Sequence, residues 1–260
     1  MTNIFNKRSS WVLPYFIFMV LFVVLPLVLI GFYALTDSNG HFTLSNLAAF
    51  FTNAKIINSF LVSMEVALEN TIICILIGYP VAYILADKDL NKSAVTALLF
   101  ILPMWINALM RTLATAEIFN TLGIQLGKGT LLFGMAYDYL PFMIYPIYNV
   151  LNKMDKSYAE AAQDLGASPM TVFLKVTLPL SMPGILSGVL MVFMPTVSTF
   201  AVSEILTNNT IQLFGSVIQE QFYNLMWNQG AALSFVMLII IGITMYISPD
   251  KDEEAEGGLI

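Results

Sequence analysis

The chain has 260 residues, of which 58% are hydrophobic and 11% charged, and its mean hydropathy is +0.78. A soluble domain carries about 25% charged and about 45–50% apolar residues, so this composition excludes a soluble enzyme or a disordered chain and indicates an integral membrane protein. The net charge of −6 argues against a nucleic-acid partner. One cysteine, Cys74, and one histidine, His41, exclude an internal disulfide and a His-rich metal site, and no catalytic residue is expected.

Six apolar runs are long enough to cross a bilayer as helices of about 20 residues each. In chain order they cover about residues 11–35, 58–86, 94–113, 131–151, 183–202 and 230–247. These runs predict an all-α, polytopic membrane protein with six transmembrane helices in a single domain, residues 1–248. Residues 249–260 contain five acids and one lysine, and they are predicted to form a disordered cytoplasmic tail.

The basic residues predict how the chain is oriented. With six spans both termini share a side, and the loops and ends on that side carry eight of the 11 basic residues: Lys7, Arg8, Lys88, Lys92, Lys153, Lys156, Lys175 and Lys251. The other side carries three: Lys55, Arg111 and Lys128. Because basic residues concentrate in cytoplasmic loops, both termini and the loop at residues 152–182 are predicted to be cytoplasmic.

The loop at residues 152–182 is predicted to form two short helices. Its expected caps and stops are Asp155 or Ser157 before the first helix, Gly166 after it, Ser168 before the second and Pro179 after it. Ser157 with Glu160 also has the spacing of a capping box. The sequence therefore predicts a small helix-turn-helix on the cytoplasmic side.

This loop resembles the EAA motif of ABC importer permeases. The matching residues are Glu160, Ala161 and Ala162, then Gly166 after three residues, Val176 after nine more, and Leu178 and Pro179 after one. Val176 stands where the usual pattern has isoleucine. The resemblance implies that the loop is a coupling helix that docks on a separate ATPase subunit, with Glu160 and Gly166 as the main docking and turn positions. Glu160 is also expected to serve the capping box, and the two roles are compatible.

Other segments are similar to the spermidine/putrescine permeases of the same family, most of all to the first of their two permease subunits. These segments are residues 11–14, 78–83, 102–112, 140–146, 183–188 and 193–204. The resemblance implies a bacterial inner-membrane importer with a second, homologous permease subunit, two ATPase subunits and an extracytoplasmic polyamine-binding protein. It also implies that ATP and Mg bind to the ATPase subunits and that this chain holds no cofactor.

Acidic and aromatic residues in the spans are candidates for the substrate pathway. Intramembrane acids are costly and tend to face cavities or partners, and aromatic rings attract organic cations. We expect Glu204 and Asp138, together with Tyr137 and Trp105, to line the pathway. Two alternatives stay open: the acids are interfacial or pair with Arg111, and Trp105 is an interfacial anchor.

Other functions remain possible from the sequence. Residues 123–130 superficially resemble a phosphate-binding loop, but the glycine spacing is one residue short and Gly129 separates Lys128 from Thr130. An ABC permease for another small solute, such as an iron complex, an amino acid or a phosphonate, would carry the same EAA loop. A stand-alone channel or secondary transporter would leave that loop unexplained. A membrane enzyme is disfavoured, because no span holds a His, Cys or paired-acid cluster.

Overall fold

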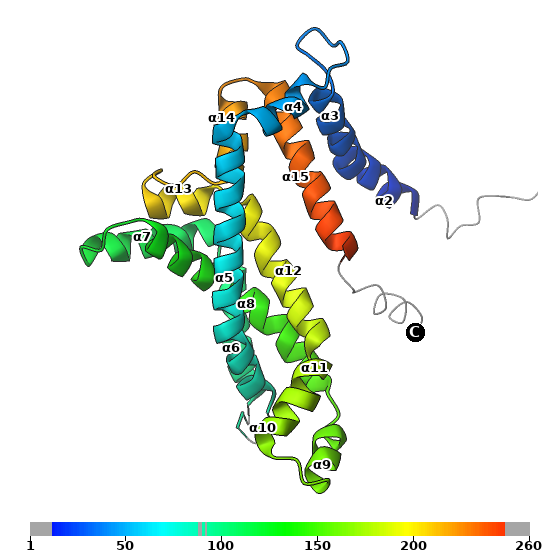
Figure 1. Cartoon of the computed structure of the whole chain (residues 1–260), viewed down its shortest axis with the longest axis vertical. Helices are drawn as coiled ribbons and strands as arrows, with labels where there is room; N and C mark the ends of the chain where they lie inside the picture. Colours follow the sequence, from blue (N-terminus) through cyan, green and yellow to red (C-terminus); the bar gives the residue numbers. More distant parts are fainter. Residues whose placement is uncertain (1–11, 88–89, 92, 248–260) are drawn as a thin grey trace, which may run out of the picture. The chain divides into compact units, whose positions relative to one another are not determined.

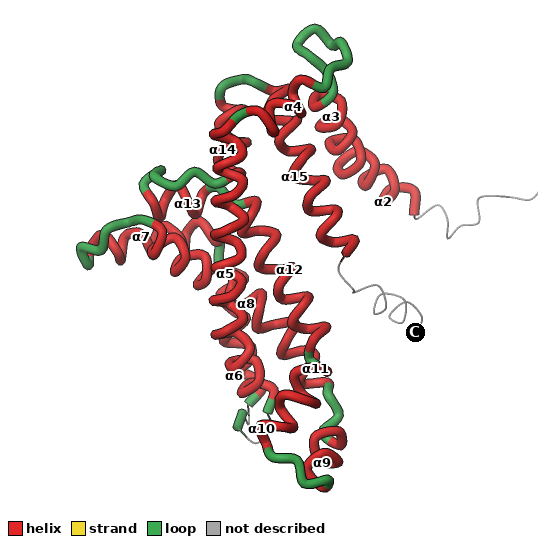
Figure 2. Tube along the Cα trace, in the orientation of Figure 1, coloured by secondary structure: helices red, strands yellow, loops and turns green. Residues whose placement is uncertain are grey.

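The computed structural model of the chain describes residues 12–87, 90–91 and 93–247. Within them the chain consists of helices and loops without a strand (Figure 2), apart from one isolated antiparallel bridge between Thr36 and Phe42. Contacts divide the chain into two compact units, residues 1–57 with 217–240 and residues 58–216 with 241–260. The predicted acidic tail, residues 249–260, lies outside the described residues.

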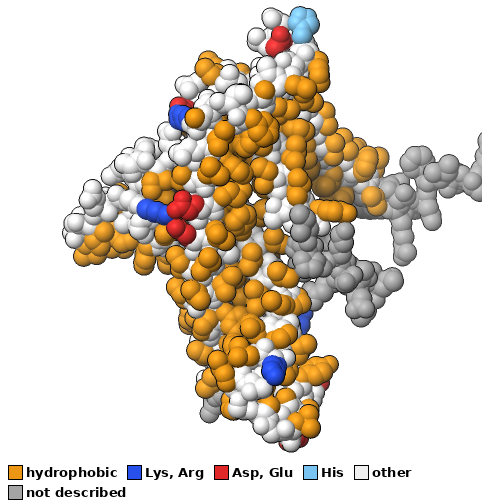
Figure 3. Space-filling view, in the orientation of Figure 1, with side chains coloured by type: hydrophobic (Ala, Val, Ile, Leu, Met, Phe, Trp, Pro, Cys, Tyr) orange, Lys and Arg blue, Asp and Glu red, His pale blue; other side chains and the backbone are white. Residues whose placement is uncertain are grey.

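Several helices are suited to a membrane. Three segments of the described residues are long and apolar enough to cross one: Val12–Ala34, Ala54–Ala86 and Trp227–Tyr246. Two bent helix pairs raise the number to five if each pair is one span. Hydrophobic side chains cover most of the face seen in Figure 3, and charged side chains are confined to small groups. The described residues form an all-helical fold suited to a membrane, and the count of six spans stays a prediction.

The first unit begins with one long apolar helix, made of α2 (Val12–Met19), a π-helical turn η1 (Val20–Val24) and α3 (Leu25–Ala34). The π turn ends two residues before Pro26. A proline ring clashes with the carbonyl four residues earlier, and a widened turn lets the helix continue past it. After α4 (Ser45–Thr52) the chain returns in α15 (Trp227–Ile247), where Asn228 Nδ2 donates to the Thr36 carbonyl over 2.7 Å.

Three helices carry the second unit: α5 (Ala54–Ala86), α8 (Lys128–Lys153) and α12 (Met182–Ser198). α8 and α12 lie side by side along much of their length (Figure 1). One apolar cluster joins all three helices through Cys74, Tyr79, Met143, Ile147 and Val192. A second cluster joins α5 and the first half of α8 to α7 (Ala108–Thr121) and α13 (Ala201–Thr207).

Glycines allow α8 and α12 to approach closely. A Cβ atom on Gly184 would lie 2.9 Å from the carbonyl oxygen of Pro146, and one on Gly188 would lie 2.7 Å from Met143 Sδ. Membrane helices cannot rely on the hydrophobic effect to associate, so small residues and close backbone packing take its place. The α8–α12 contact is of this kind.

Buried polar side chains bind one another between the helices. Asn70 Nδ2 of α5 donates to Thr196 Oγ1 of α12 over 3.0 Å, and both residues are fully buried. The hydroxyls of Tyr79 and Ser181 lie 2.9 Å apart and share a hydrogen bond. Each pair satisfies polar groups that would be costly to leave unmatched in an apolar surrounding. These four residues fix the position of α12 against α5.

The predicted third span is not one straight helix. It divides into α6 (Ala94–Ile101) with the 3₁₀ turn η2 (Leu102–Trp105), and α7, and the two parts are bent by 91°. Ile106 is extended, and Asn107 starts the new helix by accepting the N–H of Leu109 over 2.9 Å. The apolar residues continue across this break, so hydropathy alone could not locate it.

The predicted fifth span is also shorter than expected. α12 ends at Ser198, Thr199 is extended, and α13 starts at Ala201. Residues 199–202 therefore do not continue the helix that the apolar run 183–202 predicts. Pro195 lies in the last turn of α12 and removes one backbone donor there, which weakens the end of the helix.

Candidate functional site

The predicted coupling loop, residues 152–182, contains the two expected short helices. α9 (Ser157–Asp164) is followed by a turn at Gly166, whose φ of 82° is the left-handed conformation that glycine adopts without strain. The N–H of Ala167 then reaches back to the Ala162 carbonyl over 3.1 Å. Ser168 caps α10 (Pro169–Val172) by accepting the N–H of Thr171 over 3.3 Å. The local sequence thus produces this turn without help from distant residues.

Two details of this loop differ from the prediction. The Ser157–Glu160 capping box is not formed, because Ser157 is already the first helical residue; Asp155 Oδ1 accepts the Ser157 N–H instead, over 2.9 Å. That bond holds the pKa of the Asp155 carboxyl below its usual value. Pro179 does not end the second helix, which continues through the π turn η3 (Phe173–Thr177) and α11 (Leu178–Leu180).

Pro179 is tolerated for the same reason as Pro26. The π turn η3 ends two residues before Pro179, as η1 ends two residues before Pro26. The widened turn accommodates the proline ring, and the chain bends by 62° only after Leu180. Phe173 anchors this stretch by edge contacts with the rings of Tyr79 and Tyr83 on α5.

The motif residues of this loop are mostly accessible. Glu160, Ala161 and Gly166 are exposed, Ala162 and Leu178 are half-buried, and Pro179 is exposed. Glu160 lines a cavity of about 310 Å³ that is bordered by α9 and by the ends of α5 and α8. α9 is an exposed helix with three alanines and two carboxylates, Glu160 and Asp164, and such a surface can receive another protein.

Asp138 of α8 lies in a buried ion pair with Arg111 of α7. The side chains of Asp138 and Arg111 are 2% and 6% exposed, and Arg111 Nε lies 3.4 Å from Asp138 Oδ1. This distance allows a charge interaction, but the groups are not aligned for a hydrogen bond. Thr112 Oγ1 donates to Asp138 Oδ2 over 3.0 Å. Pairing with Arg111 was the alternative to a pathway role, and the structure contains that pair.

The other pathway candidates lie in different surroundings. The Tyr137 ring is half-exposed and faces the Arg111 guanidinium at 5.6 Å, so Tyr137, Asp138 and Arg111 form one group. Glu204, in the first turn of α13, is half-buried and makes no side-chain hydrogen bond or ion pair within the described part of the chain. Trp105, at the end of η2, is 86% exposed. The pathway assignment of these residues stays a prediction.

Lys128 gives the acids of α5 a partner that sequence reasoning missed. Its Nζ lies 2.6 Å from Glu65 Oε1 and 2.9 Å from Glu69 Oε1. Glu65 and Glu69 are four residues apart and therefore lie on one face of α5. Nothing in the sequence indicated that the start of α8 reaches this face.

Comparison with known proteins identifies the family. Residues 3–250 match the family described as the binding-protein-dependent transport system inner membrane component. The chain is 35% identical over 253 residues to the spermidine/putrescine transport system permease protein PotB of Salmonella typhimurium (strain SL1344), with 88% of each chain covered.

Two solved structures share the fold. A bacterial ABC transporter involved in the import of the acidic polysaccharide alginate aligns with a TM-score of 0.73 at 15% identity, covering 96% of this chain and 100% of that one. A bacterial alginate ABC transporter in complex with an alginate pentasaccharide-bound periplasmic protein aligns with a TM-score of 0.66 at 14% identity, covering 94% of each chain. The chain belongs to the binding-protein-dependent transport system inner membrane components, the permease subunits of ABC importers.

Proposed function

We propose that the chain is one of two permease subunits of an ATP-driven polyamine importer. The observation that carries the proposal is the 35% identity, over 88% of both chains, to a permease named for spermidine and putrescine. Half-buried Glu204 adds a carboxylate with no partner in the described residues, which suits an organic cation. The likeness to the alginate transporters supports the fold and says nothing about the solute.

The proposed assembly adds a second, homologous permease subunit, two ATPase subunits and an extracytoplasmic polyamine-binding protein. The family description supports the binding protein by name. ATP and Mg belong to the ATPase subunits in this proposal, and this chain supplies the pathway and the mechanical coupling. In this proposal residues 1–248 form one permease domain with six spans, and both termini lie in the cytoplasm.

The proposed coupling element is α9 with the turn that follows it. Support comes from the exposed surface of Glu160 and Ala161 and from the turn at Gly166, which fixes the direction in which α9 is presented. Leu178 and Pro179 lie in α11, just before the bend into α12. The segments α10, η3 and α11 follow one another without a break and bend only at the start of α12. A movement of α9 would thus reach α12 through this continuous helix.

The proposed pathway lies along Glu204, Asp138, Tyr137 and Trp105. Carboxylates attract ammonium groups, and each aromatic ring adds about 0.5–2 kcal/mol of cation–π attraction. Asp138 already has a counter-ion in Arg111, so a cation would have to compete with that guanidinium. Glu204 is therefore the stronger of the two candidate carboxylates.

Uptake of labelled polyamines tests the proposed function. Radiolabelled spermidine and putrescine are given to a strain without its own polyamine importers, with and without this chain and its partner subunits. We expect accumulation only when the chain is present, and competition by unlabelled polyamines but not by an amino acid, a phosphonate or an iron complex. Failure to accumulate either polyamine, or competition by one of the other solutes, would contradict a polyamine importer.

A further inference from the structure

The buried ion pair between Arg111 and Asp138 has a loose geometry. Arg111 Nε lies 3.4 Å from Asp138 Oδ1, and Arg111 Nη2 donates to the Asp138 carbonyl oxygen over 3.5 Å. Arg111 Nε and Nη1 and Asp138 Oδ1 have no hydrogen-bond partner among the described residues. A guanidinium and a carboxylate that fit each other form two parallel hydrogen bonds of about 2.7–2.9 Å. The two side chains are therefore buried together without being fitted to each other.

Such a pair is costly inside a membrane protein. The attraction between two buried charges offsets their lost hydration only when the geometry is good and the remaining donors are satisfied. The Arg111 and Asp138 side chains are only 6% and 2% exposed, and two nitrogens of Arg111 stay unmatched. Charged side chains within membrane spans generally mark substrate or ion pathways. The pair is therefore better explained as a cation site that Arg111 occupies than as a fixed contact between α7 and α8.

The groups around the Arg111 guanidinium are those of an organic-cation site. Thr112 Oγ1 donates to Asp138 Oδ2 over 3.0 Å, which leaves Oδ1 for a cation. The Tyr137 ring faces the guanidinium carbon at 5.6 Å, within the range of a cation–π interaction. A carboxylate oxygen and an aromatic face together can bind an alkylammonium ion as well as a guanidinium. Arg111 contacts both groups.

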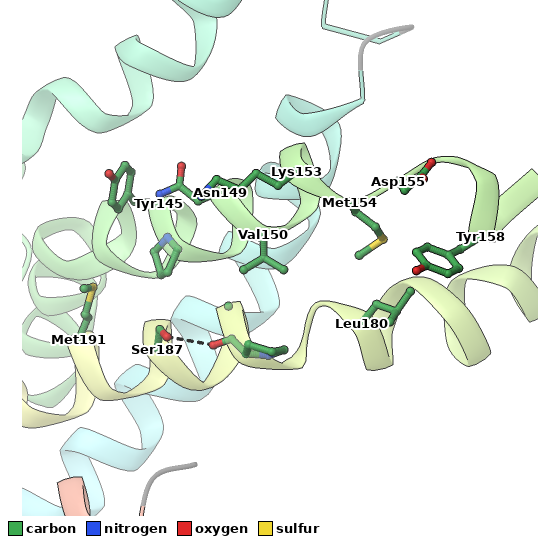
Figure 4. Close-up of a pocket in the computed structure, with 13 residues that line it drawn as sticks. Tyr145, Asn149, Val150, Lys153, Met154, Asp155, Tyr158, Leu180, Ser187 and Met191 are labelled. Atoms are coloured by element: carbon green, nitrogen blue, oxygen red, sulfur yellow. Dashed lines mark hydrogen bonds between the residues drawn. The ribbon is translucent and has the colours of Figure 1, made fainter. Parts of the chain in front are cut away.

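This site is separate from the cavity between α8 and α12. That cavity has a volume of about 600 Å³ and is lined on α8 by residues between Tyr145 and Lys153 (Figure 4). Asp138 lies seven residues before Tyr145, or about 10 Å along the helix, and does not line the cavity. The Arg111 side chain itself fills the space beside Asp138. A second cation therefore has room there only after the guanidinium has moved, and the Tyr137 ring, 45% exposed, leaves one side accessible.

We propose that Arg111 is a tethered cation. In the substrate-free transporter its guanidinium occupies the place that one ammonium group of the substrate takes beside Tyr137 and Asp138, and the substrate binds by displacing it. The inference rests on the proposed function for the substrate class, an alkylammonium ion. It gives Arg111 the role of setting the affinity of the site, because the guanidinium competes with the bound ammonium group and its return promotes release.

Direct binding of spermidine to the complete transporter tests this role. Radiolabelled spermidine is titrated onto the purified complex without ATP and without the binding protein, and ATP-driven uptake is measured in parallel. Arg111→Gln removes the competing charge, so the half-saturating spermidine concentration should fall several-fold. The maximal uptake rate should fall as well, because release becomes slower. A purely structural role of Arg111 predicts slower uptake without any gain in affinity, and that result would overturn the proposal.

Two control variants show whether the gain in affinity belongs to this site. Arg111→Gln combined with Asp138→Asn removes the carboxylate as well and should abolish the gain. Lys128→Gln removes the partner of two other carboxylates, since Lys128 Nζ lies 2.6 Å from Glu65 Oε1 and 2.9 Å from Glu69 Oε1, and should leave the half-saturating concentration unchanged. An equal gain in Lys128→Gln would show that any unpaired acid binds spermidine, and would overturn the proposal.

Tyr137 provides a test of the aromatic face. In the Arg111→Gln background, Tyr137→Phe keeps the ring and should keep the gain in affinity, whereas Tyr137→Leu should lose most of it. A gain that Tyr137→Leu does not diminish would overturn the site. If Arg111→Gln does not assemble, Arg111→Lys keeps the positive charge but lacks the planar group that stacks on a ring. A smaller gain is expected in Arg111→Lys, and no gain would overturn the proposal.

Wild-type uptake separates this inference from the proposed function. A wild-type transporter that accumulates no polyamine would refute the proposed function, and the tethered cation with it. Normal wild-type uptake, together with an unchanged half-saturating concentration in an assembled Arg111→Gln complex, would refute only the tethered cation.

Discussion

At the scale of single residues, the Arg111–Asp138 pair is the most costly feature to disturb. Asp138→Leu leaves a guanidinium buried without its counter-charge, and breaking a buried pair on one side costs about 3–5 kcal/mol. The double change Arg111→Met with Asp138→Leu removes both charges and should recover a large part of that loss. The thermal midpoint of the detergent-purified complex measures both effects. A double variant no more stable than Asp138→Leu alone would contradict the pairing.

The same variants separate a structural role of Asp138 from a pathway role. If the carboxylate only balances Arg111, polyamine uptake should return with stability in the double variant. If Asp138 binds substrate, the double variant should be stable but slow in uptake. Glu204→Gln needs no compensating second substitution, since Glu204 has no ion-pair partner in the described residues. We expect this variant to reduce polyamine uptake without a change in the thermal midpoint.

At the scale of elements, the turn after α9 depends on the backbone of Gly166 alone. A Cβ there would meet nothing within 4 Å, so Gly166→Ala acts only through the left-handed φ of 82° and costs about 1–2 kcal/mol. We expect the variant to insert normally but to retain less ATPase subunit on co-purification, with Gly166→Asn intermediate. Gly123 has a φ of 68° and equally open surroundings, which makes Gly123→Ala the matched control. Equal losses in both variants would argue against a docking role for α9.

At the α8–α12 contact, the effect of replacing a glycine depends on the space around the new Cβ and not on the backbone φ. In Gly184→Ala the new Cβ would press on the Pro146 carbonyl and on Ile147 Cα, at 2.9 and 3.1 Å, and backbone atoms cannot swing aside. We expect a loss of about 1–3 kcal/mol, seen as a lower thermal midpoint. Gly242→Ala on α15 meets nothing within 4 Å and should leave the midpoint unchanged. A neutral Gly184→Ala would contradict the close packing.

The elements also show where sequence reasoning succeeds. The caps of the coupling loop were predictable, because Gly166, Ser168 and Pro169 act on neighbouring backbone and need no tertiary contact. The helix breaks inside apolar runs could not be predicted. Asn107 and Thr199 each interrupt a helix, but the apolar run continues on both sides of them. Partners far apart in the chain, such as Asn70 with Thr196, could be suspected as polar residues in apolar runs but could not be paired. Pro179 was wrongly expected to end a helix because the preceding π turn leaves no composition signal.

At the scale of the whole molecule, the predicted count of six spans requires that α8 crosses the membrane. Its 26 residues span about 39 Å, more than the roughly 30 Å of hydrocarbon. α8 is not among the helices that qualify by apolar composition, yet its charged Asp138 packs against α7 rather than facing outward. Polar residues in a span are tolerated when they face protein, so we expect α8 to be the sixth span.

Labelling from each side of the membrane decides this count. Gln125→Cys lies in the loop before α8 and Gln163→Cys in α9 after it, and both glutamines are exposed. If α8 spans, an impermeant thiol reagent should reach Gln125→Cys only in right-side-out vesicles and Gln163→Cys only in inside-out vesicles. Same-side labelling would leave five spans and place the two termini on opposite sides. Lys153, Lys156, Lys175 and Lys251 would then share a side with Lys128. That side would carry seven of the 11 basic residues and the N-terminal side four, so the charge asymmetry that orients the chain would be reversed.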